Sequence, residues 1–173
     1  MKHRRAATVQ RIVGFLIAAS SLMMIPPALV SLWYHDGTFP LFIASAVILF
    51  LIGMVIFLPV RNAREELQIR DGFLIVAVCW VSLALVGALP FLLLSEPDIS
   101  YVDALFESMS GLTTTGATIM TNIDQLPRGI LYYRQQLQWL GGLGIVVLAV
   151  AILPMLRVGG AQLYRAETPG PLK

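Results

Sequence analysis

Four long, uncharged apolar stretches divide the chain, with shorter polar segments between them. They cover residues 12–34, 37–60, 72–95 and 135–156. Each stretch exceeds the roughly 20 residues that an α-helix needs to cross the hydrocarbon core of a bilayer. A soluble protein with four such helices would have almost no polar surface left. The pattern therefore predicts an all-α integral membrane protein with four spanning helices.

A fifth apolar segment, residues 101–112, is too short to span a membrane. It begins after Ser100, and Asp103 three positions later completes a capping-box pattern that marks a helix start. A helix of this length extends about 18 Å, which is roughly half of a bilayer. We therefore predict a re-entrant helix that enters from the outer side and turns back. The negative end of its dipole would point toward the middle of the membrane, where a cation needs stabilisation.

The half-length helix leads into a polar loop, residues 113–118, with the sequence Thr-Thr-Thr-Gly-Ala-Thr. Irregular backbone at membrane depth is tolerated only where it is buried in protein or lines a water-filled path. Carbonyl oxygens of a nearly extended chain can replace the hydration shell of a cation, threonine hydroxyls can add to the coordination, and glycine permits the required dihedral angles. We therefore predict a selectivity filter that binds the cation at Thr114, Thr115, Gly116 and Ala117. A threonine-rich turn before glycine also occurs in ordinary loops, and the flanking spans are what favour the filter.

Two residues beside the loop are predicted to support it. A carboxylate at membrane depth is unfavourable without a partner, so Glu107 is expected to lie behind the filter and to hydrogen-bond with it. The alternative is that Glu107 reaches the outer interface and is solvated there. Thr113, at the junction of helix and loop, is the second supporting residue.

Charged residues make up only 13% of the chain, about half the fraction in soluble domains, and they are unevenly distributed. Most basic residues lie at the N-terminus, after the second apolar stretch and in the tail: Lys2, Arg4, Arg5, Arg11, Arg61, Arg64, Arg70, Arg157, Arg165 and Lys173. The positive-inside rule then places both termini in the cytoplasm. Six acidic residues fall on the outer half, namely Asp36, Glu96, Asp98, Asp103, Glu107 and Asp124. Together they would concentrate cations at an entrance, although most of them, taken singly, are better explained as solvated loop residues.

Other sequence features concern the first two spans and the absence of enzymatic motifs. Pro26 and Pro27 predict a kink in the first span, because proline removes a helical hydrogen bond. The short turn at 35–37 predicts that the first two spans form an antiparallel hairpin. The sequence has a lone Cys79, no phosphate-binding loop, no metal-ligand spacing and no nucleophile paired with a base. We therefore predict that the protein is not an enzyme and uses no cofactor.

Six motifs, taken together, resemble the membrane subunits of the Trk/Ktr potassium-uptake systems, most closely those of the TrkH type. They are Asp71–Val76, Phe106–Ser108, Leu112–Thr118, Tyr133–Gln135, Gln138–Ile145 and Gln162–Glu167. The resemblance covers essentially the whole chain. It implies a potassium-channel-like fold in which one polypeptide carries four repeats, each made of a span, a pore helix, a filter and a second span. Members of the TrkH type have an additional helix pair in front of the first repeat.

By this resemblance, the chain consists of a helical hairpin followed by one repeat. Residues 1–70 would form the N-terminal transmembrane helix pair with a cytoplasmic link, and residues 71–157 the first pore repeat. Within that repeat, the pore helix is expected near 101–112 and the filter at 113–118. Residues 158–173 are expected to be a cytoplasmic linker in a truncated chain, because a filter needs four loops and the sequence contains one.

The resemblance also implies a function, which is potassium uptake or symport across a bacterial inner membrane. K⁺ would be the transported ion, and this loop would form one quarter of the filter. The implied partners are a cytosolic nucleotide-binding regulatory subunit, a second copy of the full-length protein and membrane lipid, but no nucleic acid. The single glycine of the loop predicts looser discrimination against Na⁺ than in channels with two filter glycines. Alternatives are a non-conducting truncated remnant, a four-span assembly or scaffold protein, and a channel built from four copies of this chain.

Overall fold

The computed structural model of the chain describes residues 2–63, 69–95 and 99–152, and every regular element in these ranges is a helix. The α-helices are α1 (Lys2–Ser20), α2 (Ile25–Tyr34), α3 (Phe39–Phe57), α4 (Ile69–Gly87), α5 (Leu89–Leu92), α6 (Tyr101–Leu112) and α7 (Arg128–Ile152); short 3-10 helices cover Ser21–Met24, Leu58–Val60 and Ile123–Gln125. The all-α prediction is confirmed. The predicted linker 158–173 and the motif at 162–167 lie outside the described residues.

Three helical segments are long and apolar enough to cross a membrane. They are Ala6–Tyr34, Phe39–Val60 and Gly72–Leu92. These segments correspond to the first three predicted spans, which confirms a multi-pass membrane fold. The fourth predicted span, 135–156, ends beyond the described residues, and its described part lies in α7.

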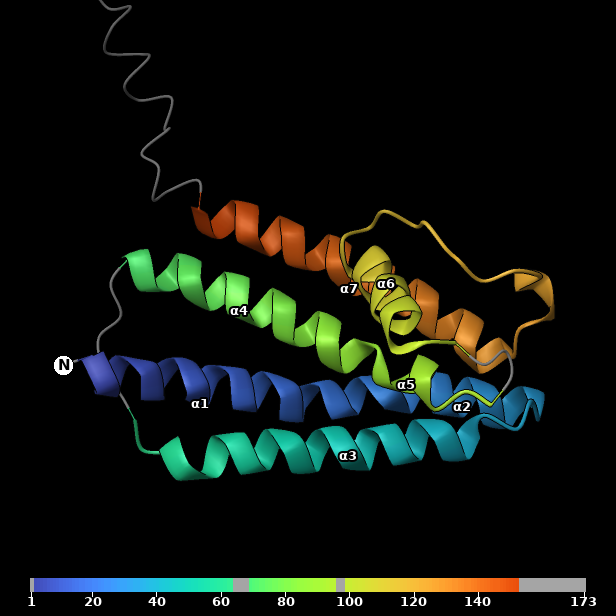
Figure 1. Ribbon diagram of the computed structural model, residues 1–173, viewed down its shortest axis with the longest axis horizontal. Helices are drawn as coiled ribbons and strands as arrows, with labels where there is room; N and C mark the ends of the chain where they lie inside the picture. Colours follow the sequence, from blue (N-terminus) through green and yellow to red (C-terminus); the bar gives the residue numbers. More distant parts are fainter. Residues whose placement is uncertain (1, 64–68, 96–98, 153–173) are drawn as a thin grey trace, which may run out of the picture.

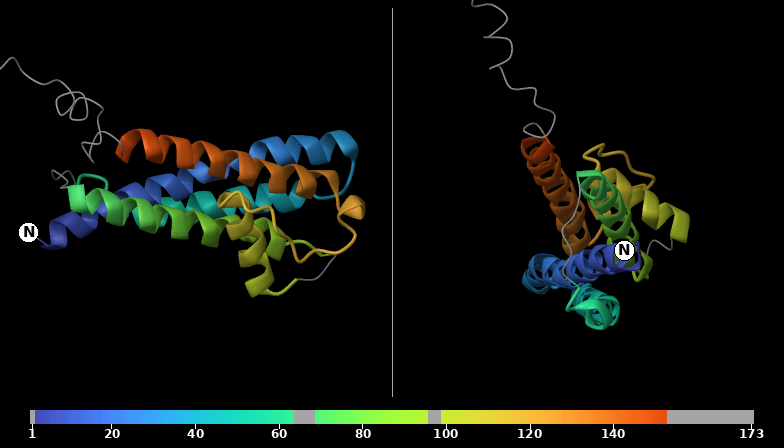
Figure 2. Two further views of the ribbon diagram at one scale, coloured as in Figure 1. Left: turned by 90° about the horizontal axis from the view of Figure 1, so that it is seen from above. Right: turned by 90° about the vertical axis from the view of Figure 1, so that its left-hand side faces the viewer.

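The first two spans form the predicted antiparallel hairpin, which makes up one side of the bundle (Figure 1). α3 runs antiparallel to α1 and α2, and the backbones approach closely at glycines. A Cβ atom on Gly53 would lie 2.3 Å from Ala18 N, and one on Gly14 would lie 2.7 Å from Phe57 N. α4 packs against α1, and α7 packs against α2, both on the side away from α3 (Figure 1). Figure 2 shows the same layering from above and along the bundle.

The first span is interrupted just ahead of Pro26 and Pro27, where the sequence predicts a kink. A 3-10 turn, Ser21–Met24, separates α1 from α2, and the two prolines lie in the first turn of α2. Because Pro27 has no N–H group, the carbonyl of Met23 four residues earlier has no helical partner. The side chain of Gln136 in α7 donates a hydrogen bond to this carbonyl oxygen at 2.9 Å. The interruption thus connects the hairpin to α7.

An aromatic cluster joins the hairpin to the remaining helices. The ring of Tyr133 in α7 lies 5.9 Å from that of Phe42 in α3 and 5.3 Å from that of Phe91 in α5, measured between centroids. All three side chains are fully buried. The Tyr133 hydroxyl donates to the carbonyl of Gly87, the last residue of α4, at 2.8 Å. The cluster fixes the first half of α7 relative to α3, α4 and α5.

Asp36, in the turn of the hairpin, caps the N-terminus of α7. The N–H of Gly129, the second residue of α7, donates to Asp36 Oδ2 at 2.7 Å. Oδ1 accepts hydrogen bonds from the N–H and hydroxyl of Thr38 at 3.0 and 2.8 Å, and from the hydroxyl of Ser31. The carboxylate therefore satisfies a donor of the first helical turn and faces the positive end of the helix dipole. Burial alone would raise the pKa of Asp36, but these hydrogen bonds outweigh it and hold the pKa below its usual value.

This lowered pKa predicts a stability change in acid. The Asp36 carboxylate should stabilise the fold at any pH above its unfolded pKa of about 3.9, and this contribution should vanish as the pH falls through the lower folded pKa. For a capping carboxylate we expect about 1 kcal/mol. Thermal unfolding in detergent at ~pH 7 and ~pH 3 should show an acid-induced loss of stability that Asp36→Asn lacks. An equal loss in both proteins would contradict this role for Asp36.

Candidate cation-binding loop

α6 begins where the capping pattern predicts. The N–H of Asp103 donates to Ser100 Oγ at 3.2 Å, and the Ser100 hydroxyl donates to the Asp103 carboxylate at 2.8 Å. The helix packs against α4 and α7. Its buried residues include four that are spaced three or four positions apart and so share one face, namely Ala104, Glu107, Ser108 and Gly111. The small residues on this face let α6 approach both neighbours closely.

α6 ends about halfway along α7. A Cβ atom on Gly111 would lie 2.8 Å from Leu137 Cβ, and one on Gly141 would lie only 2.0 Å from the carbonyl oxygen of Leu112, the last residue of α6. Gly141 is near the midpoint of α7, and Figure 1 shows α6 confined to one half of the length of the bundle. The short helix therefore brings the negative end of its dipole to the middle of the bundle.

The backbone of the loop after α6 alternates in handedness. Thr114 and Gly116 have positive φ values of 58° and 73°, whereas Thr115 between them does not. A positive φ is unfavourable for a β-branched residue such as Thr114, so hydrogen bonds must hold it. The N–H of Thr114 donates to Gly111 O at 2.9 Å, and the N–H groups of Thr115 and Gly116 donate to Ser110 O at 3.0 and 3.3 Å.

These hydrogen bonds direct three carbonyl groups away from α6. In a trans peptide, the N–H of one residue points opposite to the C=O of the residue before it. Because the N–H groups of residues 114–116 point toward α6, the carbonyls of Thr113, Thr114 and Thr115 point away from it. They accept no hydrogen bond from any residue that the structure describes. This carbonyl row, residues 113–115, is a set of oxygen ligands suited to a dehydrated alkali cation.

Of the four predicted ligands, Ala117 directs its carbonyl oxygen differently from Thr114 and Thr115. Its carbonyl oxygen accepts a hydrogen bond from Ser110 Oγ at 2.6 Å, so this carbonyl is directed back toward α6. Thr114 and Thr115 contribute free carbonyl oxygens to the carbonyl row, and Gly116 follows directly with the second positive φ. The direction of the carbonyl groups therefore reverses by Ala117.

Thr113, predicted as a supporting residue, contributes in two ways. Its hydroxyl donates to the carbonyl oxygen of Met109, one helical turn earlier, at 2.8 Å. The hydroxyl oxygens of Thr113 and Thr115 also lie 2.8 Å apart. The side chain thus ties the start of the loop to α6, while the main-chain carbonyl of the same residue belongs to the carbonyl row.

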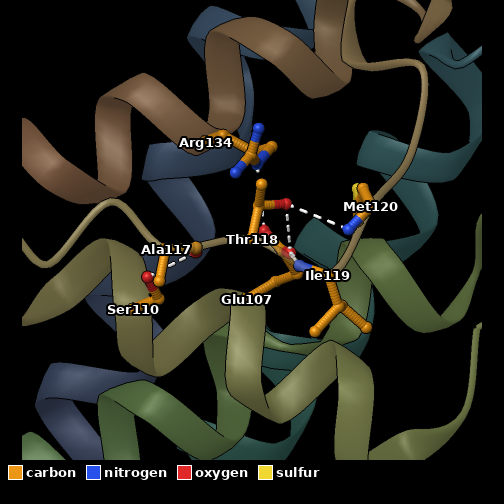
Figure 3. Close-up of polar contacts among 7 residues, drawn as sticks. All are labelled: Glu107, Ser110, Ala117, Thr118, Ile119, Met120 and Arg134. Carbon is orange, nitrogen blue, oxygen red and sulfur yellow. Dashed lines mark hydrogen bonds and ion pairs between the residues drawn. The ribbon is translucent and has the colours of Figure 1, made fainter.

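Glu107 lies behind the loop, with only 1% of its side chain exposed. Its Oε1 atom accepts hydrogen bonds from the hydroxyl of Thr118 at 2.5 Å and from the N–H of Ile119 at 2.9 Å. Its Oε2 atom lies 3.0 Å from Nε of Arg134 in α7 (Figure 3). The carboxylate therefore connects α6 and α7 with the outer part of the loop, and it does not reach an outer surface.

Sequence reasoning missed two of these residues. No role was predicted for Arg134 beyond its place in the motif Tyr133–Gln135, yet its side chain is 9% exposed and paired with Glu107. The requirement that an intramembrane carboxylate has a partner could have indicated it. Ser110 carried no such signal, because a serine hydroxyl within a helix usually bonds to its own backbone.

The sequence matches known proteins over nearly its whole length. The family model TrkH, described as cation transport protein, matches residues 39–173. The chain is 58% identical over 165 residues to the Trk system potassium uptake protein TrkH of Halomonas elongata, and 43% identical over 173 residues to TrkG of Escherichia coli. These alignments cover 95% and 100% of the chain but 34% and 36% of the relatives. The chain thus spans about a third of the length of the curated relatives it matches.

The fold of the chain also matches a solved structure over nearly the whole chain. The crystal structure of the potassium transporter TrkH from Vibrio parahaemolyticus aligns with a TM-score of 0.84 at 49% sequence identity. The alignment covers 98% of this chain and 34% of that one. Sequence and fold agree, and the chain therefore belongs to the TrkH family of cation transport proteins.

Proposed function

We propose that this chain is part of a transporter for potassium uptake across a bacterial inner membrane, and that its Thr/Gly loop supplies one quarter of the selectivity filter. The observation that carries the proposal is the carbonyl row, residues 113–115, whose oxygens point away from α6 because the following N–H groups are bonded to it. The names of the relatives, which are potassium uptake proteins, support K⁺ as the cargo.

In this proposal, the loop replaces water around the ion. Main-chain oxygens of Thr114, Thr115 and Gly116 would bind K⁺, with further oxygen from threonine hydroxyls. Glu107 and Thr113 would act as supporting residues that hold the loop from behind. The negative end of the α6 dipole would add to the attraction. Inward movement would be driven by the membrane potential, which supplies about 2.3 kcal/mol per unit charge for each 100 mV, so the step needs no cofactor.

A complete filter requires four loops around one axis. We propose that residues 71–157 act as the first of four repeats, that residues 1–70 form the additional helix pair and that 158–173 link the first repeat to the second. Both termini of the chain would face the cytoplasm. The proposed partners are a cytosolic nucleotide-binding regulatory subunit, a second copy of the full-length protein and membrane lipid.

The filter assignment can be tested in a chimera in which residues 1–173 replace the matching third of Vibrio parahaemolyticus TrkH. We expect Gly116→Ala to lower the ratio of K⁺ to Na⁺ uptake by proteoliposomes about tenfold. The reason is that a left-handed backbone costs a residue with a side chain about 1–2 kcal/mol, so the neighbouring carbonyls would shift. Gly37→Ala is the matched control, because Gly37 has a similar φ of 80°, has no atom within 4 Å of an added Cβ, and lies in the hairpin turn.

The two variants separate the proposal from its alternatives. A reduced ratio in Gly116→Ala alone supports the filter. Equal ratios in both variants would contradict it and would favour the scaffold or remnant interpretation. Uptake by liposomes that contain only residues 1–173 would instead favour a channel assembled from four copies of the chain.

A further inference from the structure

Ser110, in the last turn of α6, contacts the loop through both its main chain and its side chain. Its carbonyl oxygen accepts the N–H groups of Thr115 and Gly116 at 3.0 and 3.3 Å. Its hydroxyl donates to the carbonyl oxygen of Ala117 at 2.6 Å (Figure 3). Only 6% of the residue is exposed. Ser110 therefore holds both ends of the segment 115–117, and the hydroxyl alone accounts for the contact at the outer end.

This side-chain hydrogen bond separates two groups of carbonyls. Residues 113–115 direct their oxygens away from α6, whereas Ala117 directs its oxygen toward α6. Without a donor on α6, the Ala117 carbonyl would be an unpaired polar group in a part-buried position, and it would be free to rotate to the side of the carbonyl row, where a cation or water can reach it. The hydroxyl of Ser110 thus holds the Ala117 carbonyl out of the carbonyl row.

We propose that Ser110 is a positioning residue that sets the outer end of the ion-binding row and thereby the preference for K⁺ over Na⁺. The inference rests on the proposed function of the loop. Discrimination between the two ions depends on how many oxygens surround the ion and how firmly they are held. Loss of the hydroxyl frees the Ala117 carbonyl to reorient, which allows closer coordination of the smaller Na⁺. The expected consequence is a change in selectivity rather than a loss of transport.

Ser108 provides a matched control on the same helix. It is fully buried, and its hydroxyl has no hydrogen-bond partner in the described part of the chain. It faces α4, where a Cβ atom on Gly87 would lie 2.5 Å from Ser108 Oγ. Ser108→Ala and Ser110→Ala remove the same atom from the same helix, but only Ser110→Ala breaks a hydrogen bond to the loop.

The test uses the chimera described above in proteoliposomes, with Rb⁺ as tracer for the potassium pathway and Na⁺ as competitor. We expect Ser110→Ala to reduce the ratio of Rb⁺ to Na⁺ uptake about fivefold, the factor that corresponds to one neutral hydrogen bond. Ser108→Ala should keep the ratio of the unmodified chimera. Ser110→Thr, which retains the hydroxyl, should restore the ratio. Thermal unfolding of each variant separates a change in selectivity from a general loss of stability.

Equal ratios for Ser110→Ala and Ser108→Ala, in a chimera that still prefers Rb⁺, would overturn the role of Ser110 and leave the proposed function intact. If Ser110→Ala does not assemble, the comparison is made between Ser110→Cys, a weak donor of similar shape, and Ser110→Thr. Equal ratios in that pair would also overturn the inference. Absence of any preference in the unmodified chimera would instead overturn the proposed function, and the inference with it.

Discussion

Gly141→Ala is expected to prevent α6 from docking on α7 and to abolish ion uptake by the chimera. The added Cβ atom would lie 2.0, 2.6 and 3.0 Å from the carbonyl oxygen, carbonyl carbon and Cα of Leu112. All three are main-chain atoms at the point where α6 ends and the loop begins, so no side-chain rotation can relieve the overlap. Inserting a methyl group into a tightly packed site costs about 1–3 kcal/mol. The upper end of that range would lower the equilibrium constant for docking of α6 on α7 roughly a hundredfold.

The neighbouring glycine offers the control for this prediction. A Cβ atom on Gly142 would meet no atom closer than Thr114 Cγ2 at 3.8 Å, which is an ordinary van der Waals contact. Gly142→Ala should therefore unfold at the same temperature as the unmodified chimera, whereas Gly141→Ala should unfold at a clearly lower one. Both thermal unfolding and Rb⁺ uptake can be measured on the same preparations. Similar behaviour of the two variants would show that the contact between Gly141 and Leu112 is not needed for folding or transport.

The spans and the half-length helix could be predicted because their signals are local. Uncharged stretches longer than a bilayer crossing indicate helices whatever surrounds them. The start of α6 follows from Ser100 and Asp103, which bond to each other across one helical turn. The interruption before Pro26 follows from the missing N–H groups of two prolines. Each of these features depends on residues that follow one another in the sequence.

The contacts that shape the site could not be predicted because they join distant parts of the chain. Glu107 and Arg134 are 27 positions apart, and Asp36 and Gly129 are 93 positions apart. Periodicity shows which face of a helix is apolar, but it does not show which polar side chains on two helices meet. The left-handed backbone of Thr114 contradicts the local preference of threonine. Its conformation is held by hydrogen bonds from Thr114 and Thr115 to Gly111 and Ser110 in the last turn of α6, which override that preference.

The second large effect is expected for the ion pair between Glu107 and Arg134. Removing one partner of a buried ion pair leaves an uncompensated charge and typically costs about 3–5 kcal/mol. Glu107→Gln keeps the shape of the side chain and an oxygen that can accept hydrogen bonds from Thr118 and Ile119. The variant therefore isolates the contribution of the negative charge that Glu107 presents to Arg134. We expect this variant to unfold at a much lower temperature and to lose Rb⁺ uptake. Asp103→Asn is the control, because it changes an acid in the exposed first turn of the same helix. It should lower the free energy of unfolding by less than about 1 kcal/mol.

A double-mutant cycle then shows whether the two charges act as a pair. Arg134→Met removes the cation and leaves the buried carboxylate with its two hydrogen bonds to the loop, so it should be strongly destabilised as well. In Glu107→Gln combined with Arg134→Met, neither charge remains. The double variant should therefore be no less stable than the worse single variant, with a coupling free energy of about 2 kcal/mol or more. If the losses in free energy of unfolding of the two single variants simply add in the double variant, the two side chains stabilise the fold independently. In that case, the support of the loop would come from the hydrogen bonds of Glu107 alone, because the cation on α7 would add nothing to the position of Thr118.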